Sequence, residues 1–198
     1  NPKLINQDLH QYHRANELIK NLELVKLKEE KKAVQNKKER AIIFHPGASQ
    51  VERIWPDEHW VKLAQLMSVK NKITIVKFGN LNSLIDKLKK ADLNIDFFEG
   101  DLINLFEWLK RQRYLIAPDS MAGHLASYVG IPVLSLFGSQ DPSLVKPINI
   151  LGEVVVPDKE CHHNRKHWRL CSRCMSSITP QKVFSAFTNH ITSIERIL

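Results

Sequence analysis

Three polar residues, Asp119, Ser120 and His124, follow the apolar run Tyr114–Ala117 and begin a helical pattern over about 120–129. The apolar run predicts a buried strand. Ligands of open α/β sheets bind at the carboxyl ends of strands, where a helix start presents unbonded N–H groups and a positive dipole end. Asp119 can accept from sugar hydroxyls and Ser120 can donate to phosphate, which indicates an anion site. The structural alternative is helix capping by Asp119 or Ser120, with His124 a hydrogen-bonded core residue.

The loop after an earlier apolar run, HPGAS (45–49), carries a second set of candidates. Gly47 lets the backbone approach a phosphate, and Ser49 adds a hydroxyl. Arg53 precedes Trp55 and the next helix start, and its guanidinium can form two parallel hydrogen bonds to a diphosphate. The alternative is an ordinary loop with a solvated arginine. Trp55 is expected to pack in the core.

A third loop, FGNLNS (78–83), contains Gly79, Asn82 and Ser83. In nucleotide-binding sheets this turn meets the base and ribose, and an acidic residue usually bonds the ribose hydroxyls. The loop has no acidic residue, so Asn82 or Ser83 would take that role. The alternative is a simple turn in which Asn82 or Ser83 caps the following helix.

Strands that alternate with helices must position these loops. The strands read as continuous apolar runs rather than alternating ones, which predicts a parallel sheet covered by helices on both faces. The expected strands are 41–44, 73–78, 95–98, 114–117 and 133–137. The expected helices begin after Pro56, near Asn82, after Asp101 as cap, near Ser120, and at Thr179-Pro180.

The composition sets limits on function. The chain has 198 residues, 43% of them apolar, and a formal charge of +8. No apolar run approaches the ~20 residues that span a bilayer. The positive charge suits nucleotides, phosphorylated glycans, acidic lipid headgroups or nucleic acid. We expect no nucleic-acid partner, because no helix-turn-helix, zinc-finger or RNA-binding pattern is present. Three clustered cysteines favour a reducing cytoplasm.

The segment ECHHNRKHWRLCSRCM (160–175) admits two interpretations. Cys171 and Cys174 have metal-ligand spacing, and Cys161 with a nearby histidine would complete a tetrahedral set. Alternatively, the thiols are reduced in a basic loop. We expect no metal or other cofactor in the chemistry. The same segment holds the basic residues Arg165, Lys166, Arg169 and Arg173, which would face a phosphorylated glycan or an acidic membrane surface, or are simply solvated.

Three signatures resemble the heptosyltransferase family of GT-B glycosyltransferases. They are IIFHPGAS…RIWPDEHWVKLAQLM (42–67), IAPDSMAGHLASYVGIPVLSLFGSQDP (116–142) and CMSSITPQKV (174–183). The resemblance implies a Rossmann-like C-terminal domain over 41–198, with a Cys/His-rich loop and a last helix. It also implies that 1–40 is a helical connection and linker from an N-terminal acceptor domain that this chain lacks.

The resemblance further implies transfer of heptose from an ADP-heptose-like donor to the lipopolysaccharide inner core or a related acceptor. The site would lie at the cytoplasmic face of the inner membrane, with peripheral membrane contact. By position, the donor-binding residues would be Gly47, Ser49, Arg53, Gly79, Asn82, Ser83, Asp119, Ser120, Met121 and His124.

The chain departs from the family pattern in two ways. Met121 stands where the family has glycine, and the ribose-binding glutamate of the second loop is absent. No catalytic base is identifiable, since the family supplies it from the first domain. We therefore expect this chain alone to bind donor weakly without transfer. The alternative function is a non-catalytic module that binds nucleotides or glycan phosphates.

Overall fold

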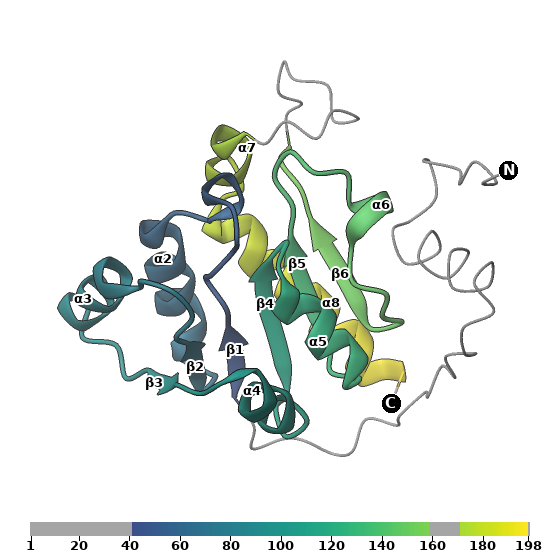
Figure 1. Cartoon of the computed structure of the whole chain (residues 1–198), viewed down its shortest axis with the longest axis horizontal. Coiled ribbons are helices and arrows are strands. Elements are labelled where there is room, and N and C mark those ends of the chain that lie inside the picture. Colours follow the sequence, from purple (N-terminus) through teal and green to yellow (C-terminus); the bar gives the residue numbers. More distant parts are fainter. Residues whose placement is uncertain (1–40, 159–170, 198) are drawn as a thin grey trace, which may run out of the picture.

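The computed structural model of the chain describes residues 41–158 and 171–197. Within them, six parallel strands form one sheet in the order β3-β2-β1-β4-β5-β6 (Figure 1). The strands are β1 Ile42–Phe44, β2 Ile73–Val76, β3 Asp96–Phe98, β4 Tyr114–Pro118, β5 Val133–Leu136 and β6 Gly152–Val155. This is the doubly wound order, which reverses between β1 and β4. The predicted Rossmann-like parallel sheet is confirmed.

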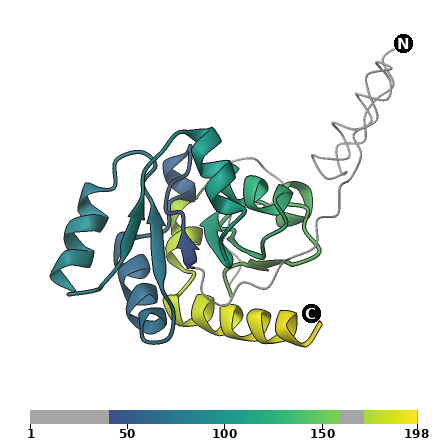
Figure 2. The ribbon, with the colours of Figure 1, turned by 90° about the horizontal axis from the view of Figure 1, so that it is seen from below.

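Helices cover both faces of the sheet, also as predicted. Helices α2, α3 and α8 pack on one face, and α4 and α5 pack on the other (Figure 2). The helices are η1 Val51–Arg53, α2 Asp57–Ser68, α3 Asn82–Lys90, α4 Leu102–Leu109, α5 Met121–Tyr128, α6 Pro142–Val145, α7 Ser172–Ser176 and α8 Pro180–Ile197.

The central strand β1 shows why the strands read as continuous apolar runs. Ile42 and Phe44 belong to the core on the α2 side, and Ile43 belongs to the core on the α4 side. Successive side chains of a strand point to opposite faces. Because both faces are covered by helices, every position of β1 is buried and must be apolar.

Local hydrogen bonds confirm two predicted helix starts. Asp101 Oδ1 accepts from the backbone N–H of Asn104 at 2.8 Å, at the start of α4. Thr179 Oγ1 accepts from the backbone N–H of Lys182 at 3.2 Å, and Pro180 is the first residue of α8. These bonds satisfy N–H groups that have no acceptor within the helix.

The predicted cap of α3 is wrong. Asn82 is already helical, and Leu81 holds the cap position without a side-chain bond. The side chain of Asn80 accepts instead from the backbone N–H of Asn82 at 3.1 Å. An asparagine that bonds the backbone two residues on forms a turn of its own. Asn80 therefore closes the turn before the helix begins.

Strand β6 was not expected from the sequence. Its four residues include Gly152 and Glu153, and only Val155 is buried. The strand pairs with β5 and ends the sheet. A short, partly exposed edge strand carries neither a continuous apolar run nor a clean alternation, so the sequence gives little sign of it.

Candidate functional site

A cavity of about 290 Å³ lies at the carboxyl ends of β1 and β4. This is the point at which the strand order reverses, where doubly wound sheets bind their ligands. Three loops, α5 and the end of α6 contribute to it. The lining residues are His45, Gly47, Ala48, Ser49, Arg53, Phe78, Asp119, Ser120, Met121, His124 and Val145.

Most of the residues that the sequence suggested meet at this cavity. The contributors from the first loop are Gly47, Ser49 and Arg53, and those from the third loop and α5 are Asp119, Ser120, Met121 and His124. Gly79, Asn82 and Ser83 are not among the lining residues; the second loop contributes Phe78 instead.

Backbone hydrogen bonds beyond the strand ends hold the starts of the first and third loops to the neighbouring strands. The N–H of His45 donates to the carbonyl of Ile116 at 3.0 Å, and the N–H of Asp119 donates to the carbonyl of Leu136 at 3.1 Å. Both bonds continue the parallel ladders of β1 with β4 and of β4 with β5. The positions of His45 and Asp119 are therefore determined by the sheet rather than by a mobile loop.

Gly47 brings the first loop against the second. A Cβ on Gly47 would lie 3.1 Å from the carbonyl oxygen of Phe78, closer than most real Cβ contacts. A side chain here would push the two loops apart. Gly79 has a different reason to be glycine, because its φ of +75° is unfavourable for other residues although the space around it is open.

Arg53 is held in place by a buried tryptophan. Arg53 ends the 3-10 helix η1, and Trp55, two residues later, is fully buried. The indole Nε1 of Trp55 donates to the carbonyl of Ile178 at 2.8 Å, and α7 packs against η1. The prediction that Trp55 packs in the core is confirmed. Its anchorage to the C-terminal part of the chain positions the arginine.

Arg53 and Asp119 form an ion pair, with 3.2 Å between Nη1 and Oδ2. The Arg53 side chain is 26% exposed and the Asp119 side chain 9%. Burial raises the pKa of the Asp119 carboxyl above its usual value, while the positive charges of Arg53 and His124 oppose that rise. A buried carboxylate and a partly buried guanidinium thus face the same small cavity.

Buried polar atoms without hydrogen-bond partners concentrate at this cavity. Among the described residues, they include both ring nitrogens of His45, Arg53 Nε and Ser120 Oγ, while Asp119 Oδ2 has only its ion pair with Arg53. Ser120 holds the N-cap position of α5, yet its hydroxyl makes no cap hydrogen bond. A buried polar group without a partner costs stability, so such groups are retained where a ligand meets them.

The sequence analysis did not single out His45. The residue is 2% exposed, and burial lowers the pKa of its ring to about 4, which makes the ring neutral at physiological pH. The only sign in the sequence is its place between a buried strand and Pro46-Gly47. Burial of the ring is a tertiary property that this local pattern does not reveal.

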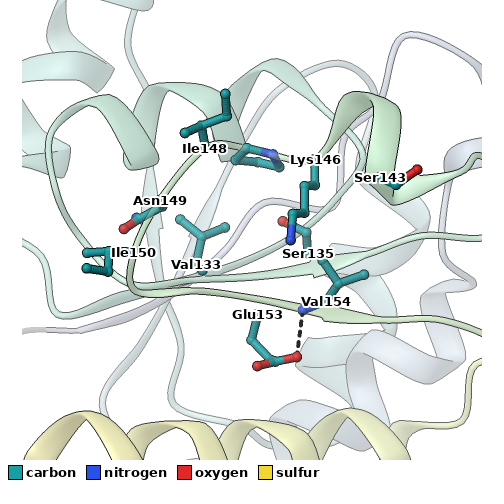
Figure 3. Close-up of a pocket in the computed structure, with 11 residues that line it drawn as sticks. Val133, Ser135, Ser143, Lys146, Ile148, Asn149, Ile150, Glu153 and Val154 are labelled. Carbon is teal, nitrogen blue, oxygen red and sulfur yellow. Dashed lines mark hydrogen bonds between the residues drawn. The ribbon is translucent and has the colours of Figure 1, made fainter. Parts of the chain in front are cut away.

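A second cavity, of about 420 Å³, lies between the sheet edge and the segment 143–150 (Figure 3). Two of its polar side chains have partners: Asn149 Nδ2 donates to the carbonyl of Ile131 at 2.7 Å, and Glu153 Oε1 accepts from the N–H of Val154 at 3.2 Å. None of its lining atoms is among the unpartnered buried ones that the structure describes. The smaller cavity is therefore the better candidate site.

The structure describes only two of the predicted metal ligands. Cys161, His162, His163 and His167 lie outside the described residues, while Cys171 is half-buried and Cys174 buried. Residues 41–158 and 171–197 contain no group of three or more His, Cys, Asp or Glu placed to hold a metal ion. In that same part of the chain, no helix is long and apolar enough to cross a membrane.

A family model, glycosyltransferase family 9 (heptosyltransferase), matches residues 7–172. The chain belongs to glycosyltransferase family 9. The matched range includes every residue that lines the 290 Å³ cavity. No curated protein sequence matches the chain at a significant level.

Solved heptosyltransferases share the fold of this family 9 chain. E. coli heptosyltransferase WaaC with ADP superposes with a TM-score of 0.71 at 16% identity, covering 94% of this chain and 58% of WaaC. For E. coli ADP-heptose lipopolysaccharide heptosyltransferase II, the TM-score is 0.64 at 19% identity, over 91% of this chain and 51% of that one. For a family 9 glycosyltransferase from Veillonella parvula, the TM-score is 0.64 at 17% identity, over 91% of this chain and 51% of that one. The chain thus spans about half the length of these structures, and the likeness confirms the GT-B heptosyltransferase type of fold.

Proposed function

We propose that this chain is the donor-binding half of a glycosyltransferase that transfers a heptose-type sugar from an ADP-heptose-like donor. The acceptor would be the lipopolysaccharide inner core or a related phosphorylated glycan or lipid. The observation that carries the proposal is the convergence of Arg53, Asp119 and Ser120, with unpartnered polar atoms, on one cavity at the strand-order reversal.

Relatives of similar fold support the choice of donor. WaaC has been solved with ADP and with ADP-2-deoxy-2-fluoro heptose, and the E. coli glycosyltransferase TibC with ADP-D-beta-D-heptose. The cavity of this chain has groups that suit both ends of such a molecule. A diphosphate needs cationic and N–H donors, and sugar hydroxyls need acceptors.

The residues divide the work as follows. Arg53 binds the diphosphate and stabilises the negative charge that grows on it as the glycosidic C–O bond breaks. Ser120 and the first N–H groups of α5 add donors to the same oxygens. Asp119 accepts from hydroxyls of the donor sugar and orients its ring. The acceptor hydroxyl attacks the anomeric carbon and gives its proton to a base that we place outside this chain.

The proposed location is the cytoplasmic face of the inner membrane, with peripheral contact. The donor chemistry and the charge of +8 support it, because a basic surface favours a phosphorylated acceptor embedded among acidic lipids. By itself the chain is expected to bind donor weakly and to transfer nothing, since it carries no identified base.

Donor titration of the complete gene product tests the proposal. Arg53→Ala should weaken ADP-heptose binding about 10- to 100-fold, the usual worth of a hydrogen-bonded charge. Arg113→Ala is the matched control: its side chain is 28% exposed and pairs with Glu195 at 3.0 Å. That variant should bind like the wild type. Equal donor affinity of the Arg53 variant and the wild type would contradict the proposed site.

The second candidate function is a non-catalytic module that binds nucleotides or glycan phosphates. Met121, 42% exposed at the cavity, favours it, because the family signature that the sequence resembles has glycine at this position, where the backbone can approach a phosphate closely. The two functions differ in turnover. If the complete gene product binds ADP-heptose in an Arg53-dependent way but transfers heptose to no lipopolysaccharide core acceptor, the module is the correct function.

A further inference from the structure

His45 occupies the inner wall of the candidate donor cavity. Its backbone is held against β4 by the 3.0 Å bond to Ile116. Its ring centroid lies 5.8 Å from that of Phe78, and its Cε1 lies 3.4 Å from the position that a Cβ on Gly47 would take. All three residues line the cavity. The imidazole is therefore held by packing, on the first and second loops, at the surface where a ligand would bind.

Neither ring nitrogen of His45 makes a hydrogen bond of normal geometry to the described residues, although the nearby backbone of His45 and Gly47 raises the pKa of the ring against the effect of burial. The residue is 2% exposed, so water does not replace those partners freely. A structural histidine is normally buried because it bonds something. The ring of His45 makes no bond of normal geometry, and other atoms without a hydrogen bond at this cavity belong to Arg53 and Ser120. The shared location favours a ligand as the missing partner.

The protonation state of His45 restricts the chemistry of that ligand. With its pKa lowered to about 4 by burial, the ring is neutral, so one nitrogen donates and the other accepts. A hydroxyl group both donates and accepts and matches such a ring. A phosphate oxygen only accepts and is better served by a cation, which Arg53 provides. Arg53, Asp119 and His124 are the charged or titratable groups that share the cavity with His45.

We propose that His45 is a specificity-determining contact of the donor site, whose imidazole hydrogen-bonds a sugar-ring hydroxyl of the bound nucleotide sugar. The hydroxyl belongs to the ribose or to the transferred sugar. The proposal rests on the proposed donor function of the cavity. It makes His45 the residue by which the site discriminates against ligands that lack that hydroxyl.

Calorimetric titration of the complete gene product with two ligand pairs tests this. The difference in affinity between ADP and 2′,3′-dideoxy-ADP measures the contribution of the ribose hydroxyls to binding. The difference between ADP-heptose and ADP measures the contribution of the transferred sugar. In the wild type the ligand with the hydroxyls should bind about 10-fold tighter in at least one pair. His45→Phe should remove that preference, and His45→Gln, which keeps a donor and an acceptor, should retain most of it. The pair that responds identifies the sugar.

Stability and pH measurements separate this role from a structural one. His45→Phe should melt at the same or a higher temperature, because it removes two buried unpartnered nitrogens. A structural histidine would give a lower melting temperature and an unchanged ligand preference, which would overturn the proposal. The pH dependence of ADP affinity gives a second test. If the affinity of the wild type rises as the pH falls below 6.5 and that of His45→Phe does not, His45 acts as a cation for phosphate and the proposal is overturned.

The outcome also distinguishes this proposal from the function on which it rests. If Arg53→Ala weakens donor binding while His45→Phe keeps the wild-type preference in both ligand pairs, only the His45 contact is wrong. If the wild-type protein binds neither ADP nor ADP-heptose, both proposals fail.

Discussion

The indole N–H of Trp55 donates to the backbone carbonyl of Ile178 at 2.8 Å, and both residues are fully buried. The bond links the loop that carries Arg53 to the turn between α7 and α8, more than a hundred residues away in the chain. Loops at the strand ends thus form the candidate donor site, and the hydrogen bond to the C-terminal segment stabilises the loop that carries Arg53.

Trp55→Phe should destabilise the fold and disturb the site together. The substitution removes the buried hydrogen bond from the indole to the Ile178 carbonyl and opens space in the core, which should lower the free energy of unfolding by about 1–3 kcal/mol. Urea denaturation measures this, and donor titration should show weaker binding because Arg53 loses its support. Val51→Ala, in the 3-10 helix η1 that Arg53 ends but at a residue 71% exposed, should stay within about 0.5 kcal/mol of the wild type. Native stability of Trp55→Phe would refute the anchoring role.

Gly138→Ala should move α7 away from the sheet. The new Cβ would lie 2.8 Å from Met175 Cγ and 3.0 Å from the Met175 backbone nitrogen, which is too close for either atom to stay in place. We expect a loss of about 1–3 kcal/mol in thermal or urea unfolding, typical of an overpacked core.

Gly79→Ala provides the contrast to Gly138→Ala. The space around Gly79 is open, and only its φ of +75° is strained, so a loss of about 1 kcal/mol is expected. If Gly138→Ala costs no more than Gly79→Ala, α7 does not depend on the close approach at Gly138.

Asp119→Asn should stabilise the protein at neutral pH while weakening donor binding. The pKa of Asp119 is raised in the folded state, so its ionised form costs stability above that pKa, and the neutral amide removes the cost. The gain in melting temperature should be largest at pH 7 and should vanish as the pH falls through the raised pKa to the usual value of 3.8.

Asp96→Asn is the control for this experiment. Asp96 pairs with Lys72 at 2.8 Å on an exposed edge strand, with side chains 54% and 64% exposed. Its replacement should give no gain at any pH, because an exposed pair contributes little. A lower melting temperature of Asp119→Asn than of the wild type at pH 7 would contradict the predicted cost of burying this carboxylate.

Acid should destabilise the protein partly through His45. Its pKa falls from the usual 6.5 to about 4 on folding, so the unfolded chain binds the proton more readily. Above pH 6.5 the titration of His45 takes nothing from the free energy of unfolding. As the pH falls from 6.5 towards 4, it lowers that free energy by roughly 3 kcal/mol. In His45→Phe the decline measured by urea denaturation should be shallower. It should not disappear, because the pKa values of His59 and His190 are lowered as well. Parallel curves for variant and wild type would show that His45 titrates normally.

Much of the fold was predictable because its signals are local. The runs at 42–44, 73–76 and 114–118 are buried throughout and apolar except for Thr74, a pattern that marks buried parallel strands. The Asp101 and Thr179 caps act within three residues of their own positions. The prediction of the α3 cap was wrong because Asn80 and Asn82 lie in the same turn and are equally suitable by residue type. Strand β6 was not predicted because an exposed edge strand needs no apolar pattern.

The sequence by itself determined that polar residues follow buried strands, and therefore that Arg53, Asp119 and Ser120 lie at one edge of a parallel sheet. Only the tertiary structure decided that β1 pairs with β4, which brings Arg53 within 3.2 Å of Asp119 and leaves the His45 ring buried without a partner. The reason is physical. Helix and strand patterns arise from neighbouring residues, whereas strand order is set by which pairing buries the most apolar surface on both faces, a property of the whole chain.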